Sequence, residues 1–226
     1  MAINNFVLLP EREGPINSQT NKHHVVIWRY GWEQSHNTLE ISDMNIGSSL
    51  GFLLEGYASI TRKIGEQKIE TTLCAGMYFC LTGLEDCIAI AGKCILIHRE
   101  GFQGLFMVGG PVEEKGRLKY IDGATDTLII PPTRIGDPCL TFINFPPHIR
   151  QALHTHPSLR IGCVFRGRGR CILPENREIL LVPGMVFAIL ANGEHAFFTD
   201  DESLDVITYH FDTDFGPDDR GGDGRS

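Results

Sequence analysis

Several features that mark common classes of protein are missing from this sequence of 226 residues. No apolar run approaches the 18 residues that a membrane-spanning helix needs. The formal net charge is −8, and sequence-independent binding to nucleic acid requires a basic face that neutralises phosphates. We therefore expect neither a membrane nor a nucleic-acid partner. The sequence also contains no nucleophile elbow, no P-loop and no dinucleotide-binding glycine motif, so the enzyme classes that those motifs mark are not indicated.

Paired cysteines and a secretory leader are absent as well. The seven cysteines form no CxxC pair, and the first residues, "MAINNFVLLPEREG", lack a basic start followed by a long apolar core. An odd number of cysteines without an export signal favours reduced, buried thiols. We expect a cytoplasmic protein.

Helical periodicity is scarce, and short apolar runs between turn residues dominate instead. These runs are four to eight residues long and rich in Val, Ile, Leu, Phe and Thr, which is the composition of strands. The sequence therefore predicts an all-β sandwich or barrel. An internal repeat, "LCAGMYFCL" at 73–81 and "LVPGMVFAI" at 181–189, indicates two such units, each with a glycine turn before a buried strand.

The repeat and the distribution of glycine and proline predict four segments. Residues 20–112 form the first barrel, and 113–138, in a stretch with many glycines and prolines, form a linker. Residues 139–212 form the second barrel. The acidic, glycine-rich residues 213–226 cannot bury enough apolar surface to order themselves, so we expect a mobile tail.

Three of the nine histidines form a set that can bind a metal ion. His154 and His156 are two residues apart, so on a strand they point to the same face. His195 follows the Gly184 turn by 11 residues, on a strand that can lie opposite in a closed barrel. Three imidazoles leave a metal with open positions, as catalytic sites require. His148, six residues before the pair, is a weaker candidate for the pocket.

These histidines carry a resemblance to a known family. "HTHPSLRIGCVFRGRG" and "PGMVFAILANGEHAFF" resemble the first and second motifs of the cupin superfamily. The resemblance implies two cupin-type jelly-roll β-barrels in tandem, a bicupin arrangement. It also implies that His154, His156 and His195 are metal ligands. The first half has Cys87 where the third histidine would fall and no HxH before it, so we expect only the C-terminal barrel to bind metal.

Arg160 departs from the family pattern, because it stands where cupins usually have a glutamate. A guanidinium stays protonated and cannot ligate a metal. Three interpretations remain open: a carboxylate clamp beside a three-histidine site, a weakened metal site, or an inactive site. A divalent ion on neutral imidazoles next to a guanidinium would attract an anion, which favours the clamp.

The resemblance and the charges together imply a metal-dependent enzyme. Our first hypothesis is a three-histidine non-haem iron dioxygenase that acts on a small carboxylate-bearing substrate, with Fe(II) favoured and Mn, Ni or Zn as alternatives. A second hypothesis is a non-redox lyase, isomerase or decarboxylase. A third is a non-catalytic cupin that binds a small ligand. Cupin barrels commonly pair, so a homodimer is expected.

Overall fold

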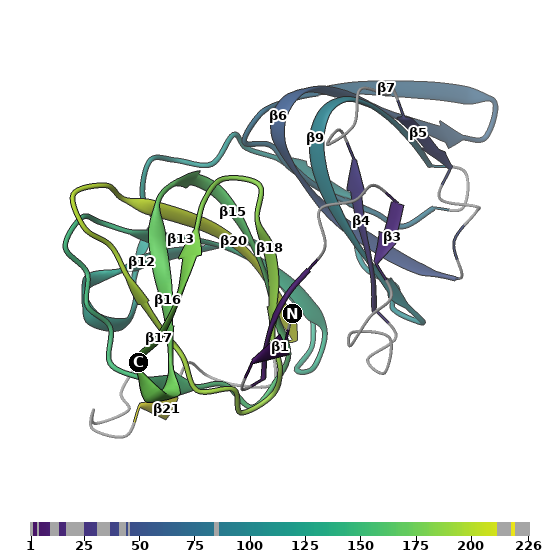
Figure 1. Cartoon of the computed structure of the whole chain (residues 1–226). Coiled ribbons are helices and arrows are strands. Elements are labelled where there is room, and N and C mark those ends of the chain that lie inside the picture. Colours follow the sequence, from purple (N-terminus) through teal and green to yellow (C-terminus); the bar gives the residue numbers. More distant parts are fainter. Residues whose placement is uncertain are drawn as a thin grey trace. The chain divides into compact units, whose positions relative to one another are not determined.

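The computed structural model describes residues 46–211 apart from residues 84 and 85, with short segments at 2–3, 5–9, 14–16, 25–30, 37–40, 44 and 218–219. The all-β prediction is confirmed. Among these residues the helical pieces are two three-residue 3₁₀ turns, Ile121–Gly123 and Pro174–Asn176. No helix among them is long and apolar enough to cross a membrane. The chain divides into two compact units, residues 10–112 and residues 1–9 with 113–226 (Figure 1).

The C-terminal unit is built on an antiparallel sheet of eight strands in the order β1-β2-β18-β15-β20-β13-β12-β11. The strands of this sheet are β1 (Ala2–Ile3), β2 (Phe6–Leu8), β11 (Leu118–Lys119), β12 (Thr125–Ile130), β13 (Pro138–Phe145), β15 (Arg160–Gly167), β18 (Val186–Ile189) and β20 (Leu204–Phe211). A three-stranded sheet, β17-β16-β19, accompanies it. That sheet consists of β16 (Gly169–Leu173), β17 (Arg177–Leu181) and β19 (Ala196–Phe198).

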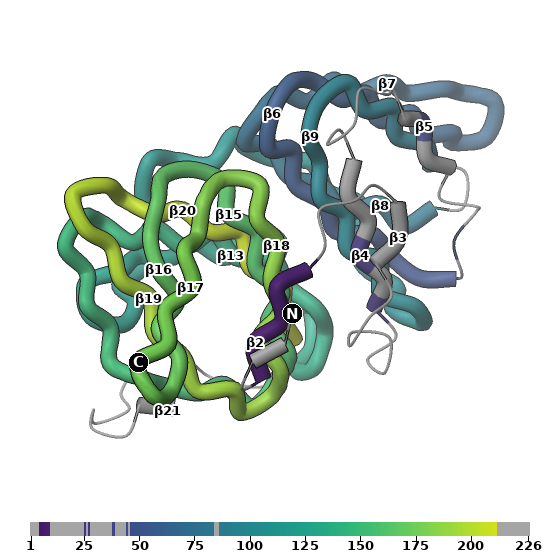
Figure 2. Tube along the Cα trace, in the orientation of Figure 1, coloured from purple at the N-terminus to yellow at the C-terminus, as the bar shows by residue number. Residues whose placement is uncertain are grey.

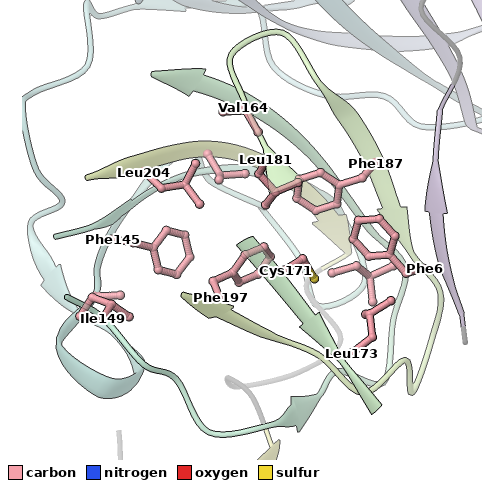
Figure 3. Close-up of a cluster of buried hydrophobic side chains, with 13 residues drawn as sticks. Phe6, Phe145, Ile149, Val164, Cys171, Leu173, Leu181, Phe187, Phe197 and Leu204 are labelled. Atoms are coloured by element: carbon pink, nitrogen blue, oxygen red, sulfur yellow. The ribbon is translucent and has the colours of Figure 1, made fainter. Parts of the chain in front are cut away.

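The interior of the C-terminal unit is apolar. Figure 3 shows side chains from several strands pointing toward one another. The buried members of this cluster are Phe6, Ala124, Phe145, Ile149, Val164, Cys171, Leu173, Leu181, Phe187, Ile189, Phe197, Leu204 and Val206. Both sheets and the N-terminal strand β2 contribute to it, so the strands wrap around one common core.

Two segments differ from the predicted boundaries. Residues 113–138, predicted as a linker, belong to the C-terminal unit, because β12 continues its sheet by pairing with β13. The predicted second barrel begins at 139, but the unit also takes in β2, which pairs with β18 (Figure 2). Strand pairing, which sequence composition does not specify, decides both assignments.

The predicted mobile tail, residues 213–226, lies mostly outside the described residues. Its described part is β21 (Asp218–Asp219), which pairs with β14 (His154–Thr155) as a two-stranded sheet. At these two positions the tail is therefore a strand.

The N-terminal unit is also antiparallel, with strand order β10-β8-β6-β9-β4-β3; β7 pairs with β6, and β5 with β9. Its strands are β3 (Gly14–Ile16), β4 (Val25–Tyr30), β5 (Asn37–Glu40), β6 (Gly47–Ile64), β7 (Gln67–Cys74), β8 (Tyr78–Leu81), β9 (Cys87–Glu100) and β10 (Met107–Gly109). Its buried cluster includes Leu53, Leu73, Phe79 and Leu96.

The repeated sequence forms the same turn in both units. Gly76 and Gly184 have φ values of 87° and 85°, in a region that side chains with a Cβ rarely adopt. The next residue in each turn is a methionine. Met77 N–H donates to the Cys74 carbonyl, and Met185 N–H to the Val182 carbonyl, both at 3.1 Å. The short sequence match therefore reflects a matching local structure.

Candidate metal centre

The segment of residues 154–156 and the loop that carries His195 are held together by backbone hydrogen bonds. His154 and His195 exchange two of these bonds, each 3.0 Å long. Asn192 N–H donates to the His156 carbonyl at 2.7 Å. The loop can turn here because Asn192 has a φ of 59°, a left-handed conformation that asparagine tolerates better than most residues. Residues that are 36 and 41 positions apart in the sequence are thus fixed side by side.

This framework brings the three predicted histidines together. One ligating nitrogen from each ring lies within 4.8 Å of the others, and all three side chains are buried. The ring centroids of His154 and His195 are 4.5 Å apart, and His156 lies 5.3 Å and 5.4 Å from them. Among the described residues, this is the one group of three or more such side chains with this geometry.

Hydrogen bonds to the backbone fix the tautomers of two of the rings. His154 Nδ1 lies 2.9 Å from the Ala152 carbonyl oxygen, and His195 Nδ1 lies 2.8 Å from the Gly193 carbonyl oxygen. A carbonyl only accepts, so each Nδ1 carries the hydrogen and donates it. The lone pair of each ring is then on Nε2, as metal ligation through that atom requires.

The environment keeps His195 neutral. Burial lowers its pKa well below the usual range for histidine, and the nearby His154 and His156 rings and the Arg160 guanidinium lower it further. A neutral imidazole is the form that binds a metal ion. The donor set, its burial and two of the three tautomers therefore fit a divalent cation.

Arg160 also faces this group, as the strand phase predicts. It begins β15, where its cross-strand partners are Ile189 on β18 and His210 on β20. Direct cross-strand partners share a face, and Ile189 is a member of the apolar cluster, so Arg160 points to the interior. Its side chain is buried; Nη2 lies 3.0 Å from His156 Nδ1, and Nη1 lies 2.8 Å from Ser158 Oγ.

The other histidines are placed elsewhere. The His148 side chain is 73% exposed and lies 3.9 Å from an Asp201 carboxylate oxygen, so it is not the pocket residue that its sequence position suggested. His210 contacts Cys139 Sγ at 3.4 Å and Thr141 Oγ1 at 3.2 Å. His98 lies in the N-terminal unit, buried, with Nδ1 2.9 Å from Ser49 Oγ. His23, His24 and His36 are outside the described residues.

Two residues that position the site were not found from the sequence. Ser158 accepts a hydrogen bond from Arg160. Gln151 is buried, and its side-chain oxygen accepts the Phe197 N–H at 3.1 Å, two residues beyond His195. Neither residue has a sequence signal beyond its proximity to residues 154–156, because each acts through a contact that only the folded chain creates.

Solved structures share the fold that brings these three histidines together. The chain matches a cupin 2 conserved barrel domain protein from Leptotrichia buccalis at 15% identity and a TM-score of 0.58, over 83% of this chain and 82% of the other. It matches protein Ylba from E. coli at 15% identity and a TM-score of 0.66, over 93% of both chains. It matches Bacillus subtilis oxalate decarboxylase, which has Mn(II) centres, at 10% identity and a TM-score of 0.58, over 97% of this chain and 78% of the other.

The fold is therefore the cupin barrel fold. The sequence matches no protein-family model and no curated protein. At 10–15% identity these likenesses concern the fold, and the chemistry has to be argued from the side chains.

Proposed function

We propose that this chain is a metal-dependent cupin enzyme in which His154, His156 and His195 hold a divalent cation. The convergence of these three buried rings, with ligating nitrogens within 4.8 Å of one another, carries the proposal. Three protein ligands are the number found in catalytic sites, where the remaining positions stay open. The favoured ion is Fe(II), since imidazole suits iron. Mn(II) is the main alternative, because an oxalate decarboxylase of similar fold has Mn(II) centres.

The substrate is a small anion that carries a carboxylate. Three neutral imidazoles leave the full charge of the cation in place, and the buried Arg160 guanidinium adds another positive charge beside His156. In an apolar barrel this arrangement repels cations and attracts anions strongly. A guanidinium also pairs with a carboxylate through two parallel hydrogen bonds, which fixes the orientation of the substrate.

The first candidate reaction is a dioxygenase reaction. When bound, a redox-active ion with open positions supplies a place for oxygen and substrate together. The residues of the chain supply the rest. Arg160 orients the acid, the carbonyls of Ala152 and Gly193 hold two of the ligand rings, and Ile189 and the other apolar side chains of the barrel limit access of water.

The second candidate reaction is a decarboxylation without net use of oxygen. It is suggested by the shared fold with an oxalate decarboxylase that has Mn(II) centres, which matches over 97% of this chain at 10% identity. Here the cation would act as a Lewis acid, and Arg160 would hold the carboxylate in the same orientation.

Metal analysis after anaerobic purification, with oxygen uptake and carbon dioxide release measured on a panel of small carboxylic acids, separates these candidates. Oxygen uptake with bound iron supports the dioxygenase, whereas carbon dioxide release without uptake supports the decarboxylase. Bound metal without turnover would leave a ligand-binding cupin. The variant His195→Ala should lose the metal, and His148→Ala, which changes an exposed histidine, should keep it. Equal metal content in both variants would refute the proposed site.

We also propose that the N-terminal unit is a second, metal-free cupin barrel. In addition to the shared glycine turn, Gly51 faces Phe79 in the way that Gly162 faces Phe187. A Cβ at either glycine would lie within about 2.1–2.8 Å of the opposing ring. In each unit, the glycine therefore leaves room for an aromatic ring to pack directly against the strand backbone. The alignment with the oxalate decarboxylase covers nearly the whole chain, and therefore both units.

A further inference from the structure

The His156 ring differs from its two neighbours in the group that its Nδ1 faces. For His154 and His195 that group is a backbone carbonyl, which accepts a hydrogen bond. For His156 it is the Arg160 guanidinium, with Nη2 3.0 Å from Nδ1. A guanidinium has five N–H donors and no acceptor. The contact therefore makes Nδ1 of His156 the acceptor.

This contact decides where the neutral His156 ring carries its hydrogen. A neutral imidazole has one N–H and one lone pair. If Nδ1 uses its lone pair to accept from Arg160, the hydrogen is on Nε2, and Nε2 then has no lone pair for a cation. Two rings of the group are thus set for ligation, and the third is in the opposite tautomer.

Metal ligation through Nε2 of His156 requires that Arg160 leave Nδ1, so that the hydrogen can reside there. Arg160 is buried and also donates to Ser158 Oγ at 2.8 Å, so a partner that accepts more strongly than His156 is needed to draw Nη2 away from that ring. A carboxylate is that partner, because it accepts two guanidinium hydrogen bonds at once. It also offsets the repulsion between the guanidinium and an incoming cation.

We infer that Arg160 couples the two ligands of this site: a carboxylate that binds the guanidinium frees His156 to complete the metal centre. The inference rests on the proposed metal site and adds to it a coupling between carboxylate binding and metal binding. Because coupling between two sites is reciprocal, the metal tightens carboxylate binding by the same factor. Couplings of this kind range from about 5-fold to about 150-fold in affinity.

Titration of the full-length, metal-free chain with Mn(II), followed by the electron paramagnetic resonance signal of free Mn(II), tests this coupling. The titration is run without and with acetate. Acetate should tighten Mn(II) binding to the wild type by about 5-fold or more. Arg160→Gln places an amide, which can accept as well as donate, beside His156. This variant should bind Mn(II) more tightly than the wild type without acetate and should show an acetate effect below about 2-fold.

Two variants act as controls for this experiment. Arg160→Lys keeps a group that only donates, so it should retain the acetate effect. Arg168→Met removes an exposed arginine just beyond β15 and should behave as the wild type. An equal acetate effect in Arg160→Gln and the wild type would mean that acetate acts on the metal directly, and it would overturn the coupling.

Nitrogen-15 NMR of the histidine rings in the wild type tests the same inference without a variant. The metal-free protein should show the His156 hydrogen on Nε2 and the His154 and His195 hydrogens on Nδ1. A His156 hydrogen on Nδ1 would overturn the inference even if metal binds. Failure of the wild type to bind Mn(II) or Fe(II), with and without acetate, would instead refute the proposed metal site, and the NMR result would stand separately.

Discussion

Replacing Gly162 by alanine should destabilise the C-terminal unit and disturb the metal centre together. Gly162 lies on β15, two residues after Arg160. A Cβ at this position would lie 2.2 Å, 2.5 Å and 2.8 Å from three ring carbons of Phe187. Real Cβ atoms essentially never approach this closely, so the Phe187 ring has to move.

The ring has little room to move, and its neighbours lead to the site. Phe187 is 2% exposed, its centroid lies 5.3 Å from that of Phe6 and 6.0 Å from that of Phe197, and Phe197 lies 5.6 Å from His195. Overpacking of a dense core costs about 1–3 kcal/mol. At about 2–4 °C per kcal/mol for a chain of this size, the unfolding temperature should fall by about 2–12 °C. The affinity for Mn(II) should fall too, because displacement of the Phe187 and Phe197 rings would shift the His195 ring from its position.

Scanning calorimetry with Mn(II) titration measures both effects, and the chain contains a matched control. Gly51→Ala creates the same clash with Phe79 in the N-terminal unit, which has no comparable group of histidines among its described residues. It should lower the unfolding temperature and leave Mn(II) affinity unchanged. In the background of Phe187→Leu, which shortens the opposing side chain, Gly162→Ala should cost much less, a coupling that a double-mutant cycle detects.

Three results would refute this reasoning. The first is a Gly162→Ala variant within about 0.5 kcal/mol of the wild type, the range of ordinary surface changes. The second is additive behaviour with Phe187→Leu, and the third is an equal loss of Mn(II) affinity in Gly51→Ala. The first result would show that the core accommodates the methyl group, and the second that the cost of Gly162→Ala does not arise from the clash with Phe187. The third would show that the affinity loss has a cause other than the displaced rings.

Further predictions concern pH, a buried carboxylate and metal binding. Burial lowers the pKa of His195, so below about pH 6.5 the unfolded chain binds a proton there that the native state does not. In urea unfolding of the metal-free protein, the free energy of unfolding should therefore decrease by up to about 1.4 kcal/mol for each unit that the pH is lowered below about 6.5. The same dependence of this free energy on pH in His195→Gln would contradict the prediction. Asp205 is buried and accepts 2.7 Å hydrogen bonds from Asn144 and Arg166. Asp205→Ala should cost about 1–3 kcal/mol by leaving a buried amide unsatisfied, whereas Asp201→Ala, at an exposed carboxylate, should have no measurable effect on urea unfolding. A metal at 100 times its Kd should stabilise the wild type by about 2.7 kcal/mol, and a thermal shift of equal size in His154→Ala would place the metal elsewhere.

The residue pattern was sufficient to predict an all-β chain and to group the three histidines that the structure brings together. Apolar runs of strand length and composition, separated by turn residues, specify β-structure wherever they occur, because alternation and turn chemistry are local properties. The glycine turns at Gly76 and Gly184 were identifiable for the same reason. His154, His156 and His195 could be grouped because strand phase and turn spacing, supported by the resemblance to cupins, limit which side chains can share an interior.

Other properties depended on contacts between distant segments, which only the tertiary structure decides. Strand pairing assigned residues 113–138 and β2 to the C-terminal unit. The exposure of its side chain and its position beside Asp201 showed that His148 is not part of the site. The group that each imidazole faces, a carbonyl for His154 and His195 but the Arg160 guanidinium for His156, sets the tautomers. The sequence thus determined which chemical groups are available to the site, and the fold decided which lone pairs those groups present, because hydrogen-bond partners are fixed only when the chain is packed.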